Sequence, residues 1–126
     1  MKIAFTVLGT PIPKARARVV AGGRAFTPER TSRYEKTVGA YALQARLRAS
    51  RDARWPLDAR YSVEIAVYRK RDDGDIDNLA KSALDGCNGV VWDDDRQVKK
   101  LTIERFECDV TERMEITVET REAPPC

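Results

Sequence analysis

The chain has 126 residues, with 23 Lys and Arg against 20 Asp and Glu, three cysteines and no histidine. Without histidine, a Ser-His-Asp or Cys-His nucleophile, a histidine zinc site and a histidine acid–base pair within one chain are all excluded. Any catalysis must therefore depend on carboxylates, lysine, a thiol or a hard metal ion, and the length favours one compact domain.

The charge is divided unequally between the two halves of the chain. Residues 1–60 contain 13 Lys and Arg against 4 Asp and Glu, whereas residues 61–126 contain 10 against 16. A basic half joined to an acidic half is expected if one surface meets a polyanion and another holds divalent cations. The alternative is that the arginines only form the solvent-exposed face of a helix.

The cysteines and the apolar segments indicate the compartment. Cys87, Cys108 and Cys126 are odd in number and far apart, so no disulfide framework is expected. The alternating segment 1–8 is too short for a signal peptide, and no run of 18 apolar residues occurs. We therefore expect a cytoplasmic protein without membrane contact.

Hydrophobic periodicity predicts the elements in chain order. Residues 2–8 alternate as a half-buried strand, and a hairpin turning at Gly22 and Gly23 follows. A long helix is predicted to begin with a capping box formed by Ser32 and Glu35. The later elements are a strand over 61–69, a helix from Asn78 to about Cys87, a short apolar run over 90–92, and strands over 98–107 and 113–120.

This order of elements predicts an α+β fold. Its two layers would be a mixed β-sheet and two helices packed on one face of the sheet. No repeat, linker or low-complexity segment marks a second domain. We expect a single domain over residues 1–121 and a frayed tail over residues 122–126.

The residues suited to chemistry concentrate in residues 69–97. Asp75 and Asp77 follow a predicted strand, and in an extended chain both carboxylates would project to the same face and could share a metal ion. Lys81 and Asp85 follow Asp77 at intervals of four, which would place all three on one helix face. Asp77 could also cap that helix. Lys81 would add a cation near a scissile phosphate or orient the nucleophile.

The third acidic element is the run Asp93-Asp94-Asp95. If the apolar run before it pairs beside the strand over 61–69, its acidic end returns toward the first two aspartates. Convergent carboxylates without histidine or thiolate form an all-oxygen set, which suits Mg²⁺ or Mn²⁺ and disfavours zinc. Such a site serves phosphoryl chemistry, in which the metal activates water and offsets charge on the transition state.

Two simpler interpretations of the acidic segment compete with a catalytic metal site. An Asp-rich loop often forms only a turn and a helix cap, which would explain Asp77 alone. A calcium loop is excluded, because Asn78 stands where glycine is needed and Leu84 where the bidentate glutamate belongs. The spaced aspartates together with Lys81 and the later run favour the catalytic interpretation. Three other acids are expected to be solvated turn charges: Asp72, Asp73 and Asp93.

Two basic clusters flank the acidic segment. Lys14, Arg16 and Arg18 alternate with alanines, so in an extended chain they share one face. Arg24 lies across the glycine turn and could join them. The second cluster stands directly before the acidic site and comprises Arg69, Lys70 and Arg71. Cations beside a metal site suit a nuclease that holds backbone phosphates around the one attacked, although each cluster alone could be a solvated face.

Two motifs in the sequence carry a family resemblance. The first is Asp75-Ile-Asp77-Asn78-Leu79-x-Lys81, followed by Asp85 and by Asp94-Asp95-x-Gln97-Val98. The second is Gly9-x-Pro11-x-Pro13-Lys14-Ala-Arg16-Ala-Arg18-Val19, then Gly23-Arg24-Ala-Phe26-Thr27-Pro28 and Tyr34-Glu35. The first motif resembles the RusA family of Holliday-junction resolvases, and the second is similar to the N-terminal part of its phage and prophage members. Family members often have proline where Ala17 stands, which bears on the rigidity of this basic segment.

The resemblance implies a small homodimeric endonuclease that binds four-way DNA junctions and, with Mg²⁺ or Mn²⁺, nicks two opposed strands symmetrically in recombination and repair. Its metal ligands would be Asp75, Asp77 and Asp95, with Asp94 as an alternative for the third. Lys81 would be the essential lysine. Other functions left open are a metal-dependent nuclease acting on flaps or duplex, and a junction-binding protein that does not cut.

Overall fold

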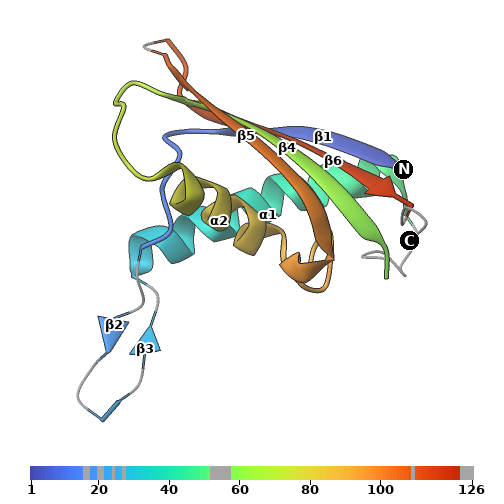
Figure 1. Ribbon diagram of the computed structural model, residues 1–126, viewed down its shortest axis with the longest axis horizontal. Helices are drawn as coiled ribbons and strands as arrows, with labels where there is room; N and C mark the ends of the chain where they lie inside the picture. Colours follow the sequence, from blue (N-terminus) through green and yellow to red (C-terminus); the bar gives the residue numbers. More distant parts are fainter. Residues whose placement is uncertain are drawn as a thin grey trace.

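The computed structural model describes residues 1–15, 18–19, 22–23, 25–26, 28–51, 58–108 and 110–122, with only the backbone for 18–19 and 25–26. Within these residues the chain forms two layers, a four-stranded mixed sheet and two helices on one of its faces (Figure 1). The elements are β1 (Lys2–Leu8), β2 (Arg18–Val19), β3 (Ala25–Phe26), α1 (Glu29–Ala49), β4 (Arg60–Arg69), α2 (Ile76–Cys87), the 3₁₀ helix η1 (Asp95–Gln97), β5 (Val98–Glu107) and β6 (Arg113–Arg121). The predicted α+β class is confirmed.

The sheet has the order β1-β6-β4-β5, and β4 supplies much of its buried face. β4 pairs antiparallel with β6 and parallel with β5, so that Ile65 lies beside both Ile116 and Ile103. Alternate β4 residues, including Val63 and Val67, are buried under the helices. The alternation of apolar and polar residues along β4 thus indicates which face of the sheet the helices cover.

The long helix α1 begins earlier than its sequence pattern predicts. Its N-cap is Pro28, and the backbone N–H of Ser32 already donates to the Pro28 carbonyl at 3.0 Å. The predicted capping box of Ser32 and Glu35 is therefore wrong. Proline is well suited to a helix start, since it has no N–H that needs a partner and its φ is preset. The buried face follows the predicted spacing through Tyr34, Val38, Ala42 and Ala45.

The two helices touch closely at a pair of glycines. A Cβ added to Gly86 would lie 2.7 Å from Cβ of Val38, and one added to Gly39 would lie 2.9 Å from the Gly86 carbonyl oxygen. Both separations are shorter than carbon atoms tolerate. Glycine at these positions thus lets α2 lie directly against α1 over the sheet.

The segment between β4 and β5 crosses over the sheet through α2, as parallel strands require. The apolar run 90–92 was considered as a possible neighbour of β4, and it does not pair there, because β4 already has β5 and β6 as neighbours. The run instead forms a turn in which Trp92 is fully buried and donates from Nε1 to the Asn88 side chain at 2.8 Å. Trp92 also packs on Tyr61, with ring centroids 5.6 Å apart.

The predicted hairpin is present as β2 and β3, which pair antiparallel and project beyond the start of α1 in Figure 1. Both turn glycines have positive φ, 99° at Gly22 and 80° at Gly23. Cys87 and Cys108 are free thiols, while Cys126 and the predicted frayed tail beyond Glu122 lie outside the described residues. In the described part of the chain, no helix is long and apolar enough to span a bilayer.

Candidate active site

The candidate site begins at the loop between β4 and α2, which internal cations hold in shape. Arg69 is only 7% exposed, and its guanidinium pairs with the Asp73 carboxylate at 2.9 Å and donates to the Asp73 carbonyl. Arg105 pairs with the Asp72 carboxylate at 3.2 Å and donates to the Gly74 carbonyl. Asp72 and Asp73 were expected to be solvated turn charges, and both side chains are indeed exposed in this loop, but each also pairs with an arginine of the sheet.

This loop places Asp75 and Asp77 at the start of α2 and not, as expected, in an extended segment. Asp75 is the extended N-cap residue of α2, and Asp77 lies within the first helical turn. The two therefore do not share one face of an extended strand. The predicted cap is also wrong, because Asp77 is inside the helix and its carboxylate accepts only from the N–H of Asn78, at 3.0 Å.

Both carboxylates are exposed and lack counter-charges. Among the described residues, neither Asp75 nor Asp77 forms an ion pair, in contrast to Asp72, Asp73 and the acids around Lys81. Two neighbouring carboxylates without a cation carry uncompensated negative charge, which a bound divalent cation would neutralise. Their oxygen donors suit a hard cation.

Lys81 is the centre of a chain of ion pairs that connects several segments. Its Nζ lies 2.9 Å from an Asp85 carboxylate oxygen and 2.8 Å from one of Asp95. The other Asp85 oxygen lies 3.1 Å from Nζ of Lys14, which also pairs with Glu35 at 2.5 Å. The predicted spacing of Lys81 and Asp85 on one face of α2 is confirmed by this contact.

These contacts keep both lysines charged. The hydrogen bonds that Lys81 donates to the carboxylates of Asp95 and Asp85 hold the pKa of Lys81 well above the ordinary lysine value. Partial burial lowers the pKa of Lys14, but the bonds to Glu35 and Asp85 outweigh it and leave that pKa raised. Lys81 is therefore a cation, not a base, at any pH near neutrality.

Asp94 and Asp95 are adjacent in the sequence but make different contacts in the structure. Asp94 is the N-cap of η1, and its Oδ1 accepts from the N–H of Arg96 at 2.9 Å, which lowers the pKa of that carboxyl. Gln97 completes the cap by accepting from the N–H groups of residues 93 and 94. The Asp95 side chain is not the cap of η1 and instead forms an ion pair with Lys81 of α2.

The fit of a metal can be tested on these positions. Among the described residues, no three Asp, Glu or Cys side chains stand close enough to form a finished metal site. Asp95 is held by Lys81, whereas Asp75 and Asp77 have no cation partner in the part of the chain that the structure describes. The donor set is nevertheless all oxygen, and the unpaired carboxylates beside a fixed lysine fit Mg²⁺ or Mn²⁺ better than a thiophilic metal.

The basic residues predicted to bind DNA differ in their exposure and in their ion pairs. Lys70 and Arg71 have exposed side chains on the loop before Asp75. Arg69 and Lys14 instead form internal ion pairs, so their charges are already compensated. Arg16 and Arg24 lie outside the described residues, and of Arg18 only the backbone, in β2, is described.

A hollow of about 690 Å³ opens beside the aspartates, between the N-terminal segment and the starts of both helices. Its lining includes Lys14, Asp75 and Asn78, and also Arg30, which the sequence patterns did not single out. Glu35 was likewise missed as a site residue because its spacing from Ser32 suggested a cap. A signal for Glu35 was its place in the Tyr34-Glu35 pair of the N-terminal motif.

Comparison with known proteins identifies the family of the chain. The chain matches the family described as Endodeoxyribonuclease RusA over residues 9–119, which includes both helices, the acidic loop and most of the sheet. A search of curated proteins found no match. The match covers far more than half of the 126 residues. The chain therefore belongs to the RusA family of endodeoxyribonucleases.

Proposed function

We propose that this protein resolves Holliday junctions by paired, symmetric nicks that depend on Mg²⁺ or Mn²⁺. Membership of the RusA family supports an endonuclease that acts on such junctions. The observation that carries the metal dependence is the exposed pair Asp75 and Asp77, which has no counter-cation in the described part of the chain and adjoins Lys81 along α2.

In this proposal Asp75 and Asp77 hold the metal, and Asp95 serves as the third carboxylate. Asp94 is less suited to that role because its carboxylate caps η1. The bound divalent ion supplies positive charge that stabilises the transition state of phosphodiester hydrolysis. The acidic loop is pinned by Arg69 and Arg105, so Asp75 is presented from a fixed backbone.

Lys81 is proposed to stabilise negative charge on the phosphate under attack. Its ammonium is held by two carboxylates, and its side chain remains half exposed, so a phosphate oxygen can approach it. A preorganised cation stabilises developing charge without reorganising during the reaction. The raised pKa of Lys81 keeps this charge present across the working pH range.

The basic residues would hold the DNA around this centre. Lys70 and Arg71 stand on the loop directly before Asp75, with exposed side chains free for phosphates. Arg16, Arg18 and Arg24 of the hairpin region remain predicted phosphate contacts on sequence grounds. Lys14 and Arg69 would act by fixing the N-terminal segment and the acidic loop.

Cleavage of three labelled DNA substrates tests the proposal. The protein is incubated with a four-way junction, a linear duplex and a flap, each with Mg²⁺, with Mn²⁺ and with a chelator. Paired nicks confined to the junction and lost in the chelator are expected. Cutting of all three substrates would support a nuclease of other specificity, and binding without cutting would support a junction-binding protein.

Asp77→Asn tests the site assignment. The amide keeps the size of the side chain but removes the charge needed for the metal, so junction cleavage should fall by at least about a hundredfold while junction binding persists. Asp93→Asn is the matched control, because Asp93 is also exposed and forms no ion pair among the described residues. Normal cleavage by Asp77→Asn would show that the site is elsewhere.

A further inference from the structure

A second hollow adjoins the one beside the aspartates. It measures about 370 Å³ and lies against the outer face of the first turns of α1. The two hollows have Ile12 and Arg30 in common. Arg30 therefore stands at the boundary between them, with the Asp75 end on one side and the surface of α1 on the other.

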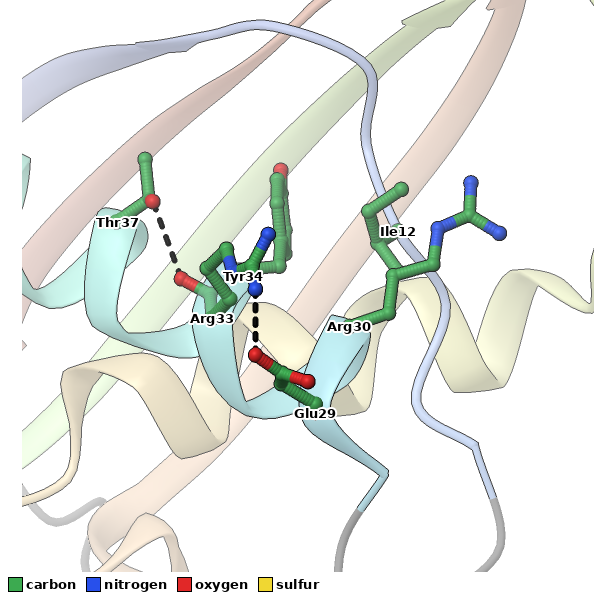
Figure 2. A pocket seen from close by; sticks show the side chains of 6 residues that line it. All are labelled: Ile12, Glu29, Arg30, Arg33, Tyr34 and Thr37. Atoms are coloured by element: carbon green, nitrogen blue, oxygen red, sulfur yellow. Dashed lines mark hydrogen bonds and ion pairs between the residues drawn. The ribbon is translucent and has the colours of Figure 1, made fainter.

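The charges around these hollows single out Arg30. Lys14 is paired with Glu35 and Asp85, and Arg33 is paired with Glu29 at 2.5 Å. Arg30 is exposed and has no hydrogen-bond or ion-pair partner among the described residues. Figure 2 shows its guanidinium directed past Ile12 and away from the Glu29–Arg33 pair.

We propose that Arg30 binds a backbone phosphate of the DNA strand next to the one held at the aspartates. This inference rests on the proposed function, since it needs DNA at Asp75. A strand that passes from one hollow to the other must cross Arg30, which offers a free guanidinium there. Guanidinium groups suit phosphate because their fork of donors matches two of its oxygens.

The alternative is that Arg30 acts only through long-range attraction, as any surface cation would. Lys36 distinguishes the two cases, because it is also exposed and unpaired in the described part of α1 but lines neither of these hollows. General attraction would make both residues contribute similarly to DNA binding. A direct phosphate contact would make Arg30 contribute much more.

The experiment measures junction binding by fluorescence anisotropy in a chelator, from about 50 to 300 mM salt, so that no cleavage occurs. Arg30→Gln should bind roughly tenfold more weakly at about 0.1 M salt and lower the slope of log affinity against log salt by about 1. Lys36→Gln should stay within about twofold of the wild type, with an unchanged slope. Arg30→Lys should keep most of the slope, since it retains the charge.

Equal behaviour of Arg30→Gln and Lys36→Gln would overturn the inference while leaving the proposed function standing. A wild-type protein that binds no junction at all would instead overturn the proposed function, and this inference with it. Because the Arg30 side chain has no partners in the described structure, its replacement should leave the thermal unfolding midpoint unchanged. A loss of binding at an unchanged midpoint would then come from the lost contact between Arg30 and DNA.

Discussion

At the scale of single residues, Asp85 links Lys81, the proposed catalytic lysine, to the N-terminal segment of the protein. One carboxylate oxygen meets Lys81 and the other meets Lys14, and the side chain is only 15% exposed. Lys14 in turn reaches Glu35 on α1, and its backbone N–H donates to the Asn78 carbonyl at 2.8 Å. Asp85 thus ties Lys81 of α2 to Lys14 of the N-terminal segment.

Asp85→Asn should reduce cleavage more than binding. The amide keeps the shape but loses the charge that orients two lysines, so the free energy of unfolding should drop by about 1–2 kcal/mol. At saturating protein, single-turnover cleavage of the junction should fall by about tenfold, while the junction dissociation constant changes by less than about threefold.

The matched control for this variant is Glu115→Gln. Glu115 also forms an ion pair, with Arg113 on β6, but its side chain is 43% exposed and lines neither hollow. Exposed pairs contribute little, so neither stability nor cleavage should change measurably. If Asp85→Asn behaves like this control, Asp85 does not position Lys81.

At the scale of elements, the contact of α1 with α2 decides where the acidic residues lie. α2 carries Asp77, Lys81 and Asp85, and it can approach α1 closely only because Gly39 and Gly86 have no side chains. Without this approach, Asp85 could not reach Lys14, which lies beside α1. The glycines were not singled out by sequence patterns, because a helical glycine gives no sign of what it faces.

Gly86→Ala should destabilise the protein. The added methyl would meet Val38 side-chain carbons and the Glu35 carbonyl oxygen at less than 3 Å. Overpacking typically costs about 1–3 kcal/mol, against about 1 kcal/mol that alanine returns in helix propensity. Because three atoms would lie within 3 Å of the added methyl, the cost should be about 2–3 kcal/mol, which leaves a net loss of about 1–2 kcal/mol in urea unfolding. Gln44→Ala on the exposed face of α1 is a control expected near zero. An unchanged or raised stability would contradict the close contact.

Element predictions succeeded where burial is periodic and failed at element ends. The strands and the buried faces of both helices follow from the spacing of apolar residues, since one covered face requires that spacing. Both helix starts were predicted too late, at residues 32 and 78 instead of 29 and 76. Caps depend on backbone angles, which the residues Ser32, Glu35 and Asp77 do not determine by themselves.

At the scale of the whole molecule, paired nicking requires two active sites. Strands related by a two-fold axis are most simply cut by two protein copies related in the same way. We therefore propose a homodimer, in which each copy provides one set of Asp75, Asp77 and Lys81. The charge asymmetry of the chain would then be repeated on both sides of the junction.

Mixed dimers test this proposal. Co-expression of the wild-type chain with a differently tagged Asp77→Asn chain, followed by purification through both tags, should yield a complex of about twice the 14.2 kDa chain mass. On a plasmid with an extruded cruciform, it should produce nicked circles, whereas the wild type produces linear DNA. A complex that cannot be recovered, or a wild type that only nicks, would contradict paired action by a dimer.

The sequence by itself determined the fold class, the family, the acidic and basic segments, and the place of Lys81 four residues before Asp85 on one face of α2. It could do so because strand and helix periods, and the separation of Lys81 from Asp85, are local properties. Tertiary structure decided which of two adjacent acids meets Lys81, that Arg69 and Lys14 are internal, and that Arg30 borders both hollows. These depend on contacts between distant segments, which the packing of α2 against α1 and the turn at Trp92 create.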